Sequence, residues 1–133
     1  MLHLDQSELD RILTFPSLVE SLRQAFAGHW TTPLRQHHGM PGLDANGTEV
    51  ENALLLMPAW TGPGDDNYIG VKLVAVYPSN GQMDLPSIHG LYYLIDGHTG
   101  QPLATMDGAR MTVWRTAAAS ALASTYLSRP DSS

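Results

Sequence analysis

The chain has 133 residues, of which 43% are hydrophobic and 15% charged, and its formal net charge is −6. This composition predicts one folded domain, and the acidic balance argues against nucleic acid and anionic membranes as partners, because both attract clustered Lys and Arg. The sequence contains no Cys, which excludes disulfides and thiolate metal sites and favours a reducing compartment such as the cytoplasm.

The first 30 residues have a helical pattern. Ser7 is a candidate N-cap for a short helix, and Pro16 lies near the first turn of a second, amphipathic helix that we expect to end near Gly28. Residues 31–50 are rich in Pro, Gly and Asn. They predict a loop with one short strand near Arg35.

Strands are predicted next. Four short runs are rich in apolar, β-branched and aromatic residues: NALLLMPAW, YIGVKLVAVYP, SIHGLYYLID and QPLATM. The connections between them are too short for crossover helices, so an antiparallel sheet is expected, and TGPGDDN between the first two runs is predicted to be a hairpin tip. Residues 31–107 are therefore predicted to be mainly strands and loops.

The last segment, from about Thr112 to residue 128, is rich in Ala and is followed by Pro130, which predicts a long helix. The fold class is then α+β. We expect an antiparallel sheet of about five or six strands, packed with N-terminal helices and the long Ala-rich C-terminal helix.

Lys72 is a cation in apolar surroundings. It shares one face of its predicted strand with Val74 and Val76, and the other face is apolar as well. Its ammonium therefore either reaches water along its own aliphatic stem or is held in a pocket against an anion.

Arg115 poses the same question from the helix. With Thr112 as N-cap, Arg115 falls in the first turn, where the helix dipole disfavours a cation and a bound carboxylate or phosphate would relieve the conflict. The alternative is a structural salt bridge to Asp107 or Asp96. Arg35 lies in irregular sequence, where an ordinary solvated arginine is the default interpretation.

Other chemistry has no support in the sequence. The six histidines lack ligand spacing, so no metal site is predicted. No phosphate loop, nucleophile elbow or pair of catalytic carboxylates is evident. From the residues alone, we predict a domain that binds a small carboxylate.

Four segments together carry a family resemblance: LLLMPAW, GVKLVAVYPSN, LPSIHGLYYLIDGHTGQPLATMDG and TVWRTAAASALASTYLSRPDSS. From about Arg35 to the last residue, the chain resembles the ornithine cyclodeaminase/mu-crystallin family. Its members are NAD(P)-dependent enzymes acting on amino acids or cyclic imino acids. They include ornithine and lysine cyclodeaminases, alanine dehydrogenases, and ketimine or pyrroline-carboxylate reductases.

The resemblance implies that residues 1–133 form a substrate-binding and dimerisation domain, and that the chain forms a homodimer. In the family a Rossmann domain follows, with the Gly-rich turn for the pyrophosphate and the catalytic aspartate. No G-x-G-x-x-G occurs in this sequence, so we expect the NAD(P)-binding Rossmann domain to be absent and the 133 residues alone to be inactive.

The resemblance also implies site residues. Arg35, Lys72 and Arg115 match the residues that hold the substrate carboxylate, and Lys72 would in addition act catalytically by polarising an imine or assisting proton transfer. Ser87 and Arg115 would touch the cofactor, NAD or NADP. Leu55 stands where ornithine-specific members carry an acidic residue, which favours a ketimine reductase or an alanine dehydrogenase over an ornithine cyclodeaminase.

An alternative of a different class remains open, in which the chain is a stand-alone, non-catalytic module for dimerisation or for binding a small ligand.

Overall fold

The computed structural model describes residues 1–64 and 67–129. The elements in chain order are β1 (Leu2–Leu4), α1 (Gln6–Ile12), α2 (Phe15–Ala27), β2 (Trp30–Thr31), β3 (Gln36–Leu43), β4 (Glu49–Thr61), β5 (Tyr68–Val76), the 3-10 helix η1 (Pro78–Met83), β6 (Ile88–Asp96), β7 (Pro102–Asp107) and α3 (Gly108–Leu127). The α+β class predicted from the sequence is confirmed.

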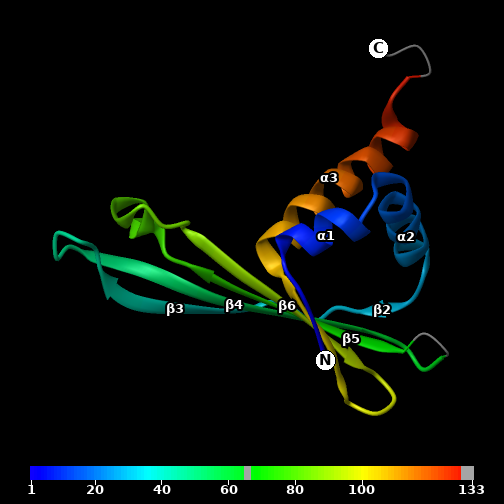
Figure 1. Cartoon of the computed structure of the whole chain (residues 1–133), viewed down its shortest axis with the longest axis horizontal. Helices are drawn as coiled ribbons and strands as arrows, with labels where there is room; N and C mark the ends of the chain where they lie inside the picture. The colour runs from blue at the N-terminus through cyan, green and yellow to red at the C-terminus, as the bar shows by residue number, and fades with distance from the viewer. Residues whose placement is uncertain (65–66, 130–133) are drawn as a thin grey trace.

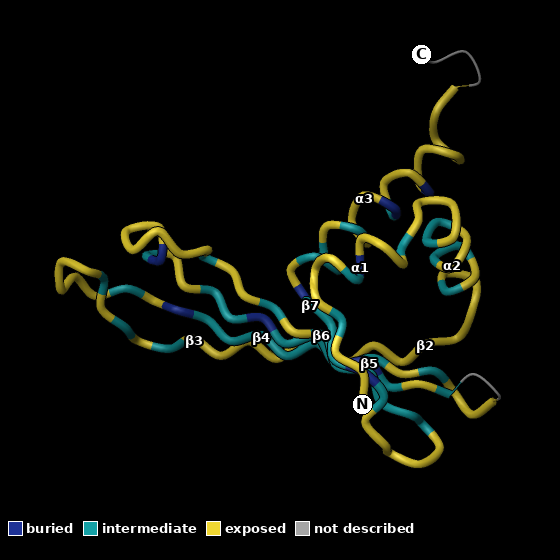
Figure 2. The backbone as a smooth tube through the Cα atoms, in the orientation of Figure 1, coloured by how far each residue is buried: buried dark blue, intermediate teal, exposed yellow. Residues whose placement is uncertain are grey.

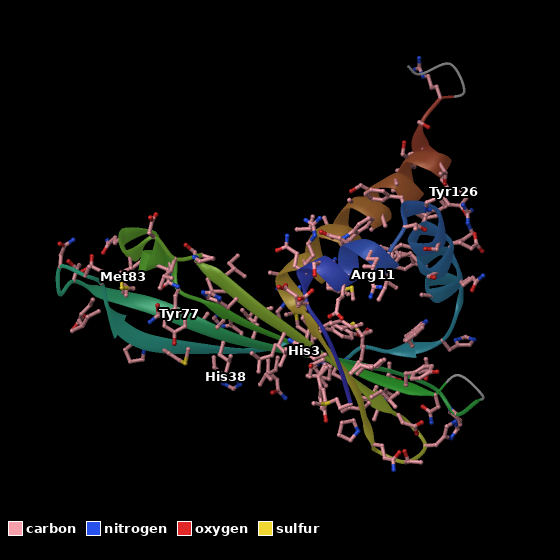
Figure 3. The ribbon with its side chains drawn as sticks, viewed as in Figure 1. His3, Arg11, His38, Tyr77, Met83 and Tyr126 are labelled. Carbon is pink, nitrogen blue, oxygen red and sulfur yellow. The ribbon has the colours of Figure 1, made fainter. Side chains whose placement is uncertain are left out.

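The strands form one sheet with the order β1-β7-β6-β5-β4-β2, and β3 pairs with β4 beyond this path. The three helices gather near one end of the sheet, while β3 to β6 extend past them with η1 near their tips (Figure 1). We call this projecting part, residues 39–53 and 76–88, the outer end of the sheet. Tyr77 and Met83 lie there, far from Tyr126 near the end of α3 (Figure 3).

The antiparallel pairing of β4 with β5, β5 with β6 and β6 with β7 agrees with the predicted sheet. The segment 62–67 joins β4 to β5 as the predicted hairpin connection; Asp65 and Asp66 lie outside the described residues. The sheet has seven strands rather than five or six, and it is mixed, because β1 pairs with β7 in parallel.

β3 was not predicted at its observed length, because its Pro and two Gly are typical of loops. β3 pairs with β4 alone, so it is an edge strand, and an edge strand tolerates a Pro that cannot donate a backbone hydrogen bond. Arg35 therefore lies just before a strand of eight residues instead of within a short one.

The N-terminal helices are capped by their own side chains. Asp5, not Ser7, caps α1: its carboxylate accepts from the Glu8 amide at 2.9 Å while the Glu8 carboxylate accepts from the Asp5 amide at 3.0 Å. This reciprocal capping box needs an acid three residues after the cap, and Glu8 lies at that distance from Asp5. Pro16 lies in the first turn of α2, as predicted, after the N-cap Thr14.

The prediction that α3 starts at Thr112 is wrong by four residues. The helix begins at Gly108, because the Asp107 carboxylate accepts from the Arg110 amide at 2.7 Å and caps it there. Arg115 consequently lies well inside the helix rather than in its first turn, and the helix-dipole argument for an anion at Arg115 does not apply.

Two contacts fix α3 in place. At its start, the backbones of Gly108 and Gly90 in β6 meet so closely that a Cβ on Gly108 would lie 2.6 Å from the Gly90 carbonyl carbon. Further along, the Asp10 carboxylate of α1 accepts from Arg110 Nε at 2.6 Å and from Trp114 Nε1 at 2.7 Å. These hydrogen bonds, that from Arg110 foremost, lower the pKa of Asp10.

The buried core is small. Most of the outer end of the sheet is exposed or half-buried (Figure 2). The buried apolar residues described are Leu9, Val74, Ala104, Ala118 and Leu122. None of the helices in the described part of the chain has the length and hydropathy needed to span a membrane.

Candidate functional site

A cavity of about 790 Å³ lies between the first half of α3 and the sheet. Its floor comes from three adjacent strands, β4, β5 and β6, and its wall from α3. The side chains and backbone that line it are those of Arg35, Leu55, Met57, Lys72, Val74, Ile88, Gly90, Gly108, Ala109, Thr112, Val113, Arg115, Thr116, Ala117 and Ser120.

The cavity brings together three cations that are distant in the sequence. Lys72 lies on β5, a central strand of the sheet, with Met57 and Tyr92 as its cross-strand neighbours. Arg115 comes from α3, and Arg35 from the connection between β2 and β3. All three of the basic residues singled out in the sequence line this one cavity.

None of the three cations has an acidic partner within the described residues. The ion pairs found there join Arg23 to Glu20 and Arg110 to Asp10. The two acids considered as structural partners of Arg115 are engaged elsewhere: Asp107 accepts from the Arg110 amide, and Asp96 accepts from amides of its own turn. The structural salt bridge is therefore not formed. Arg35 and Arg115 are exposed and Lys72 is half-buried, and all three line the cavity.

Lys72 is partly buried and tied to the helix. Its Nζ donates to Thr112 Oγ1 at 2.5 Å, and the same hydroxyl donates to the Gly108 carbonyl at 2.5 Å. Burial, followed by repulsion from Arg115, lowers the pKa of Lys72 below its ordinary value. A bound anion would stabilise the charged form of Lys72, because it offsets both the cost of burial and the repulsion from Arg115.

The remaining walls are mainly apolar, with the hydroxyl-bearing Thr112, Thr116 and Ser120 contributed by α3. Leu55, Met57, Val74, Ile88 and Val113 line the cavity, and no Asp or Glu is among its lining residues. A ligand with a negative group at one end and a small hydrocarbon body fits this combination. A ligand with a second, distal cation finds no acidic partner here.

Ser87 does not line the cavity, although its neighbour Ile88 does. The Ser87 carbonyl accepts from the Tyr77 amide at 2.8 Å, which closes the connection between η1 and β6. Its contact with a cofactor stays a prediction.

Thr112 is a cavity residue that the sequence reasoning assigned only as a helix cap. Its distance from Arg115 in the sequence could have indicated that it belongs to the site. Thr112 precedes Arg115 by three residues, and residues three apart on a helix share a face.

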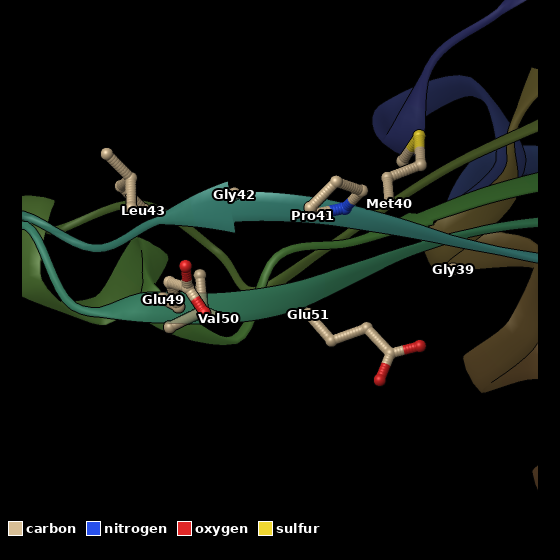
Figure 4. A pocket seen from close by; sticks show the side chains of 8 residues that line it. All are labelled: Gly39, Met40, Pro41, Gly42, Leu43, Glu49, Val50 and Glu51. Carbon is tan, nitrogen blue, oxygen red and sulfur yellow. The ribbon is translucent and has the colours of Figure 1, made fainter.

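A second hollow, of about 630 Å³, runs along the β3–β4 hairpin (Figure 4). It is lined by Gly39, Met40, Pro41, Gly42, Leu43, Glu49, Val50 and Glu51. Its charged residues are both acidic, so it does not suit a carboxylate ligand. No three His, Asp or Glu side chains of residues 1–64 and 67–129 come together as a metal site would require.

Comparison with known proteins gives consistent matches. A model of the ornithine cyclodeaminase/mu-crystallin family matches residues 6–133. The Δ(1)-pyrroline-2-carboxylate reductase of Colwellia psychrerythraea is 38% identical over 121 residues, which are 90% of this chain and 36% of that protein.

Solved structures agree with these sequence matches. The Thermococcus litoralis Δ(1)-pyrroline-2-carboxylate reductase in complex with NADH and L-proline is 34% identical, with a TM-score of 0.77, over 99% of this chain and 39% of that one. An archaeal alanine dehydrogenase dimer with bound NAD is 29% identical, also with a TM-score of 0.77, over 100% of this chain and 39% of that one.

The chain therefore spans well under half the length of these relatives. The family model nevertheless matches almost all of its residues, and the resemblance found in the sequence is confirmed. The chain belongs to the ornithine cyclodeaminase/mu-crystallin family.

Proposed function

We propose that this chain forms the substrate-binding and dimerisation part of an NAD(P)-dependent oxidoreductase that acts on a cyclic imino acid or a small amino acid. The observation that carries the proposal is the group of three cations, Arg35, Lys72 and Arg115, that line one apolar cavity without an acidic partner among the described residues. A substrate carboxylate would supply the missing negative charge.

In this proposal each cation has a role set by its position. Arg35 and Arg115 bind the carboxylate oxygens, for which the planar guanidinium offers paired N–H donors. Lys72 lies on the floor of the same cavity, from which it would contact the carboxylate and hold a proton near the substrate nitrogen. The apolar side chains bind the hydrocarbon part and exclude water.

The cofactor would be NAD or NADP, which supplies or accepts the hydride at the substrate's α-carbon. Arg115 and Ser87 are the residues of this chain proposed to touch it. Residues 1–64 and 67–129 contain no strand–turn–helix unit with a Gly-rich turn to seat a pyrophosphate, so these contacts would concern the nicotinamide end.

The substrate proposed first is a cyclic imino acid such as Δ(1)-pyrroline-2-carboxylate, whose reduction gives proline. The apolar wall at Leu55 and Met57 supports it, as do the two Δ(1)-pyrroline-2-carboxylate reductases described above, one of them solved with L-proline. An alanine dehydrogenase ranks next, and an ornithine cyclodeaminase last, because the lining residues offer no acid for a distal ammonium.

The first test is substitution of Arg115 in the enzyme that carries this chain. We expect Arg115→Ala to raise KM for the imino acid and to lower kcat/KM about 30-fold, equivalent to roughly 2 kcal/mol, because one charged partner of the carboxylate is lost. The measurement is steady-state oxidation of NAD(P)H. Arg23→Ala is the matched control, because Arg23 pairs with Glu20 and Tyr126 away from the cavity.

An unchanged kcat/KM in Arg115→Ala would show that this cavity does not bind the reacting carboxylate. If the protein binds carboxylates but turns over no amino or imino acid, the result would instead support the alternative of a non-catalytic binding module. The proposal also includes a homodimer, and a cytoplasmic location remains a prediction from the sequence.

A further inference from the structure

Thr112 occupies an unusual place between the helix and the lysine. Its single hydroxyl group makes two short contacts, one to Lys72 Nζ and one to the Gly108 carbonyl, both at 2.5 Å. It also lines the cavity together with Lys72.

The direction of both hydrogen bonds follows from proton counting. A hydroxyl has one proton to donate, and a backbone carbonyl can only accept, so the Thr112 proton is committed to Gly108. Towards Lys72 the hydroxyl oxygen can therefore only accept. One N–H of the ammonium is used in this bond, and the other two are left for a ligand in the cavity.

The oxygen of Thr112 is itself held firmly. Gly108 is the first residue of α3, and its backbone rests against Gly90 of β6. The hydrogen bond to the Gly108 carbonyl thus ties the hydroxyl to the point where helix and sheet are in closest contact. Lys72 is fixed from the sheet through its backbone and from the helix through its ammonium.

A neutral hydrogen-bond partner affects the Lys72 ammonium differently from a charged one. An Asp or Glu in this place would hold the ammonium but cancel its charge, whereas a hydroxyl restrains it and leaves the charge for a ligand. We propose that Thr112 is the positioning residue of the site, which holds Lys72 Nζ in the cavity with its charge and two N–H groups directed at the substrate. The part that concerns the substrate rests on the function proposed above.

The sequence makes this testable, because Lys72 is the only lysine of the chain. Selective ¹³C labelling of lysine gives one Cε signal, whose relaxation reports the order of that side chain on the picosecond–nanosecond scale. We expect a restrained Cε in the wild type and in Thr112→Ser, which keeps the hydroxyl, and a mobile Cε in Thr112→Val, which replaces it with a methyl group of similar shape.

Thr125→Val is the matched control. Thr125 also lies in α3 and also donates to a backbone carbonyl, that of Leu122 at 2.7 Å, but it is remote from Lys72. We expect Lys72 Cε to stay restrained in this variant. Circular dichroism and thermal melting of each variant verify that α3 is retained. If Thr112→Val does not fold, the comparison of Thr112→Ser with wild type still tests whether the hydroxyl alone is enough to restrain Lys72.

A Cε that is equally restrained in Thr112→Val and wild type would overturn the positioning role. A Cε already mobile in the wild type would do the same. Restraint lost in Thr112→Val and kept in Thr112→Ser and Thr125→Val supports it.

Titration of the same labelled chain with L-proline separates this inference from the proposed function. We expect Thr112→Val to weaken proline binding about tenfold, the loss typical of one hydrogen bond to a charged group. If wild-type Lys72 is restrained but L-proline leaves its signal unmoved up to high millimolar concentration, the positioning role of Thr112 stands, and the proposed binding of a small cyclic carboxylate in this cavity is contradicted.

Discussion

At the scale of single residues, the side chain at position 55 is the one we expect to influence most strongly which ligand fits. Leu55 lies on β4 opposite Val74 of β5, and both line the cavity. It is half-buried, so a ligand that contacts it is shielded from water on that side. An apolar group at this point favours the ring of an imino acid and offers nothing to a distal ammonium.

Exchanging this group should change the preference between ligands. We expect Leu55→Glu to shift the ratio of the affinities for L-ornithine and L-proline at least tenfold towards ornithine, because a carboxylate in a partly desolvated wall pairs with the distal ammonium and no longer packs on the proline ring. The measurement is titration of the labelled chain with each ligand. Leu55→Met conserves volume and apolar character and should leave the ratio unchanged.

Affinities that fall equally for both ligands in Leu55→Glu would contradict this assignment of the wall. Such a result would mean that residue 55 supports the cavity without touching the variable part of the ligand.

Single residues also show how far sequence reasoning reaches into the site. Lys72 stands out because a cation among apolar neighbours is costly unless it is partnered, and the structure places it on the cavity. Arg115 lines the same cavity, but the helix-start argument that singled it out is wrong, because α3 begins at Gly108. The Thr112 tether could not be predicted in the same way. It depends on where α3 begins, which is decided by the cap at Asp107 and by the close backbone contact of Gly108.

At the scale of elements, the position of α3 depends on the absence of a side chain at its first residue. A Cβ on Gly108 would lie 2.6 Å from two backbone atoms, the Gly90 carbonyl carbon and the Leu91 nitrogen. Backbone atoms cannot rotate away as a side chain can, so the start of the helix would have to move off β6. The wall of the cavity moves with it.

We therefore expect Gly108→Ala to destabilise the fold by about 1–3 kcal/mol, as overpacking does elsewhere, despite the better helix propensity of Ala. Urea unfolding followed by circular dichroism measures this. Gly81→Ala in η1 is the control, because a Cβ there meets no atom within 4 Å, and a change within about 0.5 kcal/mol is expected. Equal stability of Gly108→Ala and wild type would show that the backbones of Gly108 and Gly90 can move apart at little cost in free energy.

Elements were predictable where the local pattern and the tertiary context agree. The strands β4 to β7 combine apolar runs with short connections, and their antiparallel order follows from those two features. β3 departs from its local pattern, because pairing with β4 outweighs the turn preference of Gly39, Pro41 and Gly42. β1 is three residues long and is defined only by its distant partner β7, so nothing local could indicate it.

At the scale of the whole molecule, the chain exposes more surface than its mass warrants. Its accessible surface is 9183 Å², whereas a folded monomer of 14.5 kDa is expected to expose about 6900 Å². The helices cover one face of the sheet. The other face, which we call the bare face, carries Leu56, Pro58, Val71, Leu73, Leu91 and Tyr93, none of which is buried.

The bare face is the surface on which we expect the homodimer to form. A charge in its middle should oppose association, so Leu91→Glu is expected to raise the dimer dissociation constant about 100-fold or more, because an unpaired carboxylate would be buried in both subunits. Multi-angle light scattering over a dilution series measures this. Leu127→Glu, at the end of α3 and already 83% exposed, should leave the dimer intact.

A wild-type chain that remains monomeric at tens of micromolar would contradict the dimer itself. Association that is unchanged in Leu91→Glu would place the interface on another surface.

The parallel pairing of β1 with β7 has a consequence for how the chain folds. Leu2 pairs with Ala104, about a hundred residues later, so β1 has no strand partner until β7 has been synthesised. The hairpins of β4, β5 and β6 form from neighbours in sequence and can assemble earlier. Completion of the sheet by β1 is therefore a late event in folding, after the pairs of neighbouring strands have formed.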